Sequence, residues 1–441
     1  MDTKALRQKI LDLAIHGKLV PQDSNDEPAS VLLERIRAEK ERLIKEGKIK
    51  KGKKSAKTSD KPHYPFELPK GWCFTNIGEL LINRDGERKP VSSAIRSKQS
   101  NKIYDYYGAA GVIDKIDDYL FDEKLLLIGE DGANLLSKSK NNAFFAEGKY
   151  WVNNHAHVLD ATDKNLLEYV AIVINAIKLD DYITGSAQPK LSQDNLNKIP
   201  IVLPPLSEQK RIMEAIIHWS LLIEQIEQNK IDLQASIKQA KSKVLDLAIH
   251  GKLVSQDLND EPASELLKRI NPKAEITCDN PQYGKLPKGW CETTLGNTIV
   301  IKSGDAIKVR DNRIGKYPIY GGNGITGYNE SYNVDGINII IGRVGFYCGS
   351  VHYVNNKIWV TDNAFVTKIM GNVYTPKFLY YLLQQYDLQQ YSNSTAQPVI
   401  SGKTVYPINV MLPPLSEQYR IVAKIEELFS QLDKIESSLQ A

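Results

Sequence analysis

Residues 11–36 read LDLAIHGKLVPQDSNDEPASVLLERI, and residues 245–270 read LDLAIHGKLVSQDLNDEPASELLKRI. The two stretches differ at four of their 26 positions, so the chain contains two copies of one element. Working outward, each copy continues to a Pro-Lys-Gly-Trp motif (69–72 and 287–290) and then to the heptapeptide LPPLSEQ (203–209 and 412–418). This repeat predicts a protein built from two related halves.

Between these matching points the copies diverge. Residues 84–102 (RDGERKPVSSAIRSKQSNK) face residues 302–316 (KSGDAIKVRDNRIGK) with little in common. One scaffold carrying two different recognition surfaces predicts this pattern. A duplication that drifted without function is the alternative.

Two long helices follow the LPPLSEQ motifs. Apolar residues recur from Ser207 with alternating spacings of four and three, which is typical of a coiled-coil seam. The positions are Ile212, Ile216, Trp219, Ile223, Ile226, Leu233, Ile237, Ala240, Val244 and Leu247. We expect one helix over about 207–250, and a second that repeats the seam from Ile421 to Leu439.

The ends of the chain complete the second helix. The C-terminal helix stops where the N-terminal one, with Leu6, Ile10 and Leu13 on its seam, begins in the repeat. We therefore predict an α+β fold in which two globular target domains with short twisted strands are joined by two long antiparallel coiled-coil helices, in a pseudo-twofold circular arrangement. A plain dimerisation device is the alternative interpretation of the heptads.

The predicted boundaries follow from these motifs. They are an N-terminal helical region with a basic linker (1–61), a first target domain (62–206), a central helical region (207–282), a second target domain (283–414) and a C-terminal helix (415–441). Trp72, Trp290, Trp151 and Trp359 stand at matching places, and we expect them in the domain cores.

Composition narrows the class of protein. The 441 residues include 57 Lys and Arg, 53 Asp and Glu, and four cysteines without a Cys-x-x-Cys pair, so neither a zinc site nor a redox dithiol is indicated. The sequence lacks an apolar run long enough for a membrane helix, and we expect a cytoplasmic protein. Charge is uneven, since the second target domain carries 12 basic and 7 acidic residues and the first carries 16 and 19.

Basic and amide side chains in the divergent segments are the candidates for contact with a polyanion. Lys and Arg hold phosphates, Arg can read guanine, and Gln can read adenine. In the first domain the candidates are Arg84, Arg88, Lys89, Arg96, Lys98, Lys102, Gln188 and Lys190, and in the second Lys302, Lys308, Arg310, Arg313, Lys316, Arg343, Tyr347 and Gln397. Solvated loop charge, and glutamines that cap their own turns, are the alternatives.

Sequence patterns that resemble catalytic motifs lack the context that chemistry needs. Residues 322–327 match G-x-G-x-x-G, but no amphipathic helix follows, so we interpret them as a turn. Residues 401–404 (SGKT) resemble the end of a phosphate-binding loop without its first glycine. His16 and His250 precede glycines and are expected at helix C-termini.

Taken together, the paired LPPLSEQ helices, the paired LDLAIHGKLV elements and the Pro-Lys-Gly-Trp openings resemble a type I restriction-modification specificity (S) subunit, over nearly the whole chain. The resemblance implies a non-catalytic subunit that reads an asymmetric, bipartite site on double-stranded DNA. It implies docking of two methyltransferase (M) subunits, which carry the S-adenosylmethionine chemistry, and of restriction-translocase (R) subunits. A coiled-coil scaffold that binds only proteins is the main alternative.

Overall fold

The computed structural model describes residues 2–49, 67–185, 187–278, 286–307, 315–393 and 398–439. These residues form an N-terminal unit (residues 2–228) and a C-terminal unit (residues 229–441), each compact in itself. Both combine helices with small sheets, which confirms the predicted α+β class with two domains. Most of the basic linker lies outside the described residues.

The N-terminal unit opens with α1 (Thr3–Ile15) and α2 (Ala29–Lys45). Its strands are β1 (Cys73–Asn76), β2 (Ile82–Asn83), β3 (Tyr104–Gly108), β4 (Gly111–Ile116), β5 (Phe121–Asp122), β6 (Leu125–Gly129), β7 (Ala143–Ala146), β8 (Lys149–Val152), β9 (Ala156–Asp160) and β10 (Pro200–Leu203). Short helices α3 (Ile77–Leu80), α4 (Ser93–Arg96), α5 (Asn134–Ser137) and α7 (Gln193–Lys198) connect them, together with the longer α6 (Asn165–Ala176).

These strands pair in the orders β2-β9-β6-β7, β4-β3-β8-β5 and β1-β10. Neighbouring strands are antiparallel except β3 and β8. Strand β6 reads LLLIG and is buried along its whole length, as a continuous apolar run in the middle of a covered sheet should be.

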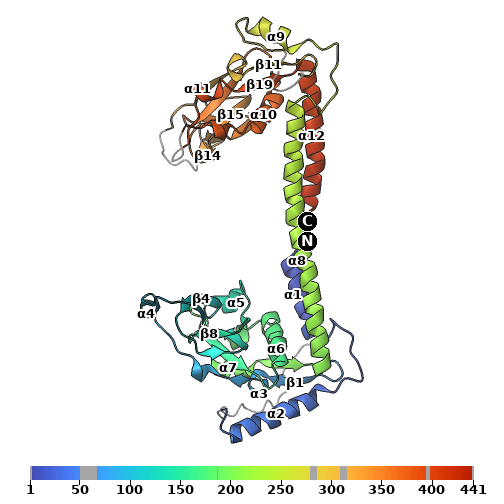
Figure 1. The fold of residues 1–441 in the computed structure, drawn as a ribbon, viewed down its shortest axis with the longest axis vertical. Coiled ribbons are helices and arrows are strands. Elements are labelled where there is room, and N and C mark those ends of the chain that lie inside the picture. Colours follow the sequence, from blue (N-terminus) through green and yellow to red (C-terminus); the bar gives the residue numbers. More distant parts are fainter. Residues whose placement is uncertain are drawn as a thin grey trace. The chain divides into compact units, whose positions relative to one another are not determined.

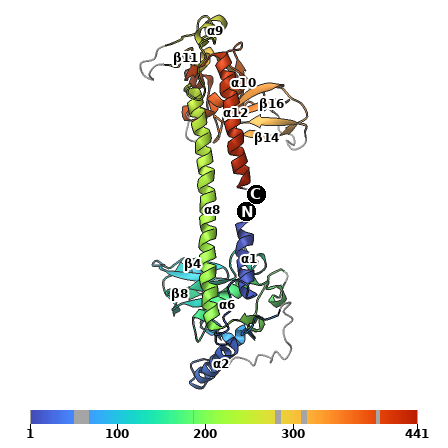
Figure 2. The same ribbon diagram turned by 90° about the vertical axis from the view of Figure 1, so that its right-hand side faces the viewer.

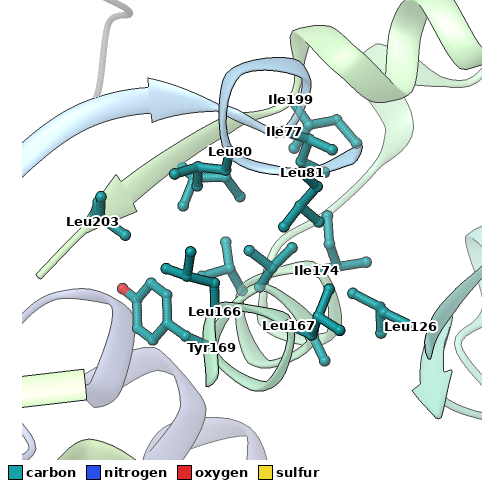
Figure 3. Close-up of a cluster of buried hydrophobic side chains, with 14 of the residues drawn as sticks. Ile77, Leu80, Leu81, Leu126, Leu166, Leu167, Tyr169, Ile174, Ile199 and Leu203 are labelled. Carbon is teal, nitrogen blue, oxygen red and sulfur yellow. The ribbon is translucent and has the colours of Figure 1, made fainter. Parts of the chain in front are cut away.

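Helix α6 is apolar on most of its surface and forms the centre of this core. Figure 3 shows Leu166 and Tyr169 on the side of Leu80 in α3 and Leu203 in β10, and Leu167 beside Leu126 in β6. The Tyr169 hydroxyl donates a hydrogen bond to the Val202 carbonyl at 2.7 Å, so its one polar group is satisfied inside the core.

The C-terminal unit repeats this plan. Its strands are β11 (Cys291–Thr294), β12 (Ile299–Ser303), β13 (Tyr317–Gly321), β14 (Gly324–Asn329), β15 (Ile337–Gly342), β16 (Val351–Asn355), β17 (Trp359–Val360), β18 (Ala364–Ile369) and β19 (Asn409–Leu412). They pair in the orders β12-β18-β15-β16, β14-β13-β17 and β11-β19. Its helices include α9 (Ala263–Ile270), α10 (Pro376–Gln385), α11 (Gly402–Val405) and α12 (Leu415–Ser438).

Helix α8 (Leu206–Ile249) contributes residues to both units and agrees within one residue with the predicted 207–250. In the N-terminal unit α1 lies beside its first part (Figures 1 and 2), and Arg7 forms an ion pair with Glu227 at 3.1 Å. In the C-terminal unit α12 lies beside its second part, and Lys241 pairs with Glu436 at 3.0 Å. Both pairs run antiparallel.

The predicted seam is only partly a contact surface. Ile212, Ile223 and Ile237 are buried, but Trp219 is 43% exposed and Ile226 38% exposed. Trp219 and Ile237 lie at the same angle around a straight helix, each about 20° from Ile212, yet only Ile237 is buried. Coverage by a neighbouring segment, and not rotation of the helix, therefore decides which seam positions are buried, and placing Trp219 and Ile226 in the contact was wrong.

The repeated sequence builds the same junction in each unit. The Trp72 indole donates to the Glu208 carboxylate at 2.9 Å, and Trp290 donates to Glu417 at 3.0 Å. Both tryptophans are buried, as predicted, whereas Trp151 and Trp359 are only partly buried.

Further equivalent contacts complete the two junctions. Arg211 pairs with Asp26 at 2.7 Å and Arg420 with Asp260 at 2.6 Å. His16 lies at the C-terminal end of α1, as predicted, with its ring on the Asp12 carbonyl. The 26-residue repeat therefore forms the junction through which a helix pair packs against the globular part of each unit.

Candidate nucleic-acid interface

Each unit presents a short loop where the central strand of a four-stranded sheet ends. We call these the strand-end loops: Gly129-Glu130-Asp131-Gly132 after β6, and Gly342-Arg343-Val344-Gly345 after β15. The last glycine of each has a positive φ, +97° and +99°, which is a conformation that favours glycine. A Cβ on the first glycine would overlap a carbonyl oxygen, of Ala109 at 2.6 Å or of Gly322 at 2.3 Å.

The same backbone hydrogen bonds hold the two loops. The Glu130 amide donates to His155 and its carbonyl accepts from Leu191, and Arg343 makes the matching bonds with Asn363 and Ile400. The final glycine amides donate to the carbonyls of Pro189 and Pro398, the prolines of the two Ala-Gln-Pro sequences. The same backbone arrangement thus carries the carboxylate of Glu130 in one unit and the guanidinium of Arg343 in the other.

In the N-terminal unit the loop acid organises a charged cluster. The Glu130 carboxylate lies 2.8 Å from Arg88 and 3.2 Å from Lys190. His157 is buried and contacts the Asp85 carboxylate at 2.6 Å through Nδ1 and the Leu191 carbonyl at 2.8 Å through Nε2.

The charges of this cluster compensate one another. Burial alone would raise the pKa of Asp85, but the hydrogen bond from His157 and the positive charge of Arg88 outweigh it and lower the pKa. Ligand atoms of Asp85, Glu130 and His157 lie within 4.8 Å of one another. Because Arg88 and His157 Nδ1 already contact these carboxylates, and His157 Nε2 is taken by the Leu191 carbonyl, we interpret the cluster as an ion-pair network that stiffens the loop.

In the C-terminal unit Arg343 replaces this network. Its guanidinium contacts the Asp362 carbonyl at 3.2 Å and the Ser303 hydroxyl at 3.4 Å, and it lies 5.5 Å from the Phe365 ring centre. Across the part of the chain that the structure describes, no carboxylate pairs with Arg343, and its buried Nε has no hydrogen-bond partner. An arginine without an anionic partner suits a site that receives an anion or a base edge.

Several predicted basic residues of the first domain are held inside the protein. Arg84 pairs with Glu87, Glu123 and Asp160, and this pairing raises its pKa. Arg96 and Lys102 share Asp114 at 2.8 and 3.1 Å, and these bonds lower the pKa of that carboxyl. Like Arg88, the Arg96 side chain is only 12% exposed, so these arginines position segments of the surface.

Other predicted residues are exposed. Lys89, Lys98, Gln188, Lys190, Lys302, Lys316 and Tyr347 all lie at the surface. Lys308, Arg310, Arg313 and Gln397 lie outside the described residues. The DNA contacts of the whole set remain predictions.

The sequence reasoning did not identify the Glu130 cluster or the exposure of Phe346. Aligning GEDG with GRVG would have indicated the loop pair, because both follow an apolar strand, but the charges around Glu130 come from distant segments. Phe346 directly follows Gly345 and is 76% exposed, and its neighbour Tyr347 is 53% exposed.

The motif-like patterns have structural roles, as expected. Gly322 and Asn323 form the turn between β13 and β14. Ser401 and Thr404 form a capping box at the start of α11. Among the helices of the described residues, none combines the length and apolar character needed to cross a membrane.

Comparison with known proteins identifies the family. The family model described as the type I restriction modification DNA specificity domain matches residues 69–237 and 287–441. The chain is 26% identical to the type I restriction enzyme EcoEI specificity subunit of Escherichia coli, over 99% of this chain and 91% of that protein. It is 28% identical to the EcoAI specificity subunit of Escherichia coli, over 98% and 90%.

A solved structure shares the fold. The crystal structure of the HsdS subunit from Thermoanaerobacter tengcongensis superposes with a TM-score of 0.51 at 14% identity, covering 85% of this chain and 93% of that one. Since the family model matches well over half of the sequence, the chain belongs to the type I restriction-modification specificity subunit family.

Proposed function

We propose that this chain is the DNA-reading subunit of a type I restriction-modification complex and that it recognises an asymmetric, bipartite site. The strand-end loops carry this proposal. Two loops with one backbone frame hold Glu130, which pairs with Arg88 and Lys190, in one unit and Arg343, without a carboxylate partner among the described residues, in the other, so the two surfaces differ at the same position. Two such readers specify two different short sequences rather than a palindrome.

The exposed lysines supply contacts that do not depend on sequence. Lys89 and Lys98 in one unit, and Lys302 and Lys316 in the other, are exposed and can meet phosphates, and Lys190 is exposed while its ammonium group pairs with Glu130 at 3.2 Å. Such contacts fix the register of a protein on DNA and make binding fall steeply with salt. Arg343 is the candidate for guanine O6 and N7.

The chain acts in this proposal without a catalytic site of its own. Methylation, with S-adenosylmethionine as methyl donor, belongs to the two M subunits, and cleavage to the R subunits. The complex works in the cytoplasm, where its DNA lies.

The outward face of α8 is a candidate surface for an M subunit. Ile217 and Leu221 are 56% and 55% exposed and lie one turn apart, on the side of the helix opposite Ile212 and Ile223. Apolar side chains at this spacing form a stripe that a partner helix can cover. The LDLAIHGKLV elements, by contrast, have their alanines buried in the junctions.

The function is tested by mapping methylated bases in a host that carries this chain with its M and R partners. We expect one bipartite motif with two unlike halves. Arg343→Gln should lower methylation about 5- to 150-fold, as expected for loss of a bidentate base contact of about 1–3 kcal/mol. Arg269→Ala is the charge control, because Arg269 lies on α9, pairs with Glu261 and is outside both loops.

The alternative scaffold function gives a different outcome. A complex of this chain with M subunits that binds duplex DNA no better than M alone, with no salt dependence added by the chain, would favour a scaffold that binds only proteins. A Leu221→Glu variant that retains full M binding would remove the α8 face from the proposal.

A further inference from the structure

The C-terminal unit holds two aromatic rings outward beside Arg343. Phe346 and Tyr347 meet edge to face, with ring centroids 5.0 Å apart, and Phe346 is among the most exposed large apolar side chains of the described residues. Exposed rings of this kind on a folded domain mark a surface that another molecule covers.

The backbone beneath the rings is fixed. The Phe346 carbonyl accepts a hydrogen bond from Gln389 Nε2 at 2.7 Å, and the Cys348 amide donates to Gly345 at 2.9 Å. Cys348 is buried, which anchors the segment immediately after the rings. The rings are therefore presented in one place by a rigid support, as an insertion element requires.

The charge beside the rings indicates what covers them. Arg343, three residues before Phe346 and four before Tyr347, meets no carboxylate among the described residues, and its domain carries 12 basic against 7 acidic residues. A protein partner with an apolar patch would leave this charge unmatched. A DNA duplex matches both features, because phosphates and guanine edges attract the arginine, while the stacked bases offer an apolar space to a ring.

We propose that Phe346 is a wedge that inserts between adjacent base pairs in the half-site contacted by the C-terminal unit, with Tyr347 supporting it from the side. This inference rests on the proposed function. The N-terminal unit has Ala133 and Asn134 at the corresponding positions after Gly132, so it lacks a wedge. Only one half of the bipartite site is thus unstacked and kinked.

The test uses the complex of the full chain with its M subunits and the duplex identified by methylation mapping. 2-Aminopurine, which becomes brighter when its stacking is lost, is placed at each position of the site in turn. We expect the 2-aminopurine fluorescence to increase at one base step, in one half-site only. Phe346→Ala should abolish the signal and weaken binding about 5- to 150-fold, the range for loss of a stacked aromatic side chain. Phe346→Trp should retain both.

The control is Leu258→Ala, which removes an apolar side chain that is 71% exposed and lies outside the strand-end loops, and it should change neither the fluorescence nor the affinity. If the complex binds and methylates its site but Phe346→Ala matches the parent protein in fluorescence and affinity, the wedge is refuted while the proposed function stands. If the complex with unchanged Phe346 shows no specific binding at all, the proposed function itself fails.

Discussion

Substituting Gly17 by alanine tests whether the repeated junction holds each unit together. Gly17 follows α1 with φ +64°, and a Cβ added there would lie 2.4 Å from Pro69 Cγ and 3.2 Å from Trp72 Cζ2. Gly251 is its counterpart, also at φ +64°, with 2.4 Å to Pro287 Cγ and 3.1 Å to Trp290 Cζ2. Both variants thus combine backbone strain with overlap against the same two side chains.

The magnitude follows from these two contributions. A non-glycine residue in the left-handed region costs about 1–2 kcal/mol, and forcing a methyl group into a packed site costs about 1–3 kcal/mol. We expect Gly17→Ala and Gly251→Ala each to lower the local free energy of opening by about 2–5 kcal/mol. Gly47→Ala provides the matched control, because Gly47 has φ +72° but nothing within 4 Å of an added Cβ, so only the strain remains.

Hydrogen exchange followed by mass spectrometry on the full chain measures these energies separately for each segment. Gly17→Ala should speed exchange in peptides covering α1 and β1, and Gly251→Ala in those covering β11 and the end of α8. Gly47→Ala should affect only the end of α2. If Gly17→Ala cost no more than Gly47→Ala, the close packing of the junction would be disproved.

Three further sets of substitutions probe the same architecture. Trp72→Phe and Trp290→Phe should each lower the free energy of unfolding in urea by about 1.5–3 kcal/mol, because each removes a hydrogen bond to a buried carboxylate. Trp151→Phe should lower it less, because the Trp151 indole donates to the backbone of Lys89 near the surface. Ile212→Ala and Ile421→Ala, at fully buried matching positions, should each cost about 2–5 kcal/mol in the same assay, whereas the exposed Ile217→Ala should stay within about 0.5 kcal/mol of the parent protein. Burial raises the pKa values of Glu208 and Glu417 above their usual 4.5, despite the tryptophan hydrogen bonds, so their contribution to stability is present at low pH and declines as pH rises through the raised pKa values. Unfolding measured from pH 4 to 7 should show that decline reduced in a Glu208→Gln, Glu417→Gln variant, and an unchanged pH profile would contradict it.

The sequence alone was sufficient for the features that depend on local pattern. The helix from Leu206 to Ile249 follows from its periodic apolar residues and from Pro204 and Pro205, which stop a helix upstream. The helix-end positions of His16 and His250 follow from the glycine after each, because the next residue takes a positive φ. Repetition made these assignments stronger, since each pattern occurs twice.

The tertiary structure decided which basic residues are available at the surface. Arg84 and Arg88 lie in a segment where basic residues outnumber acidic ones, and each pairs with an acid three residues away, Glu87 or Asp85. Strand pairing then brings Glu123 and Glu130 against them from about 40 residues away. Heptad spacing likewise placed Trp219 on the seam, but it stays 43% exposed while Ile237, at the same angle around the helix, is buried, so coverage by another segment decides. In both cases the outcome depends on the position of a distant segment, and periodicity and spacing carry no information about that position.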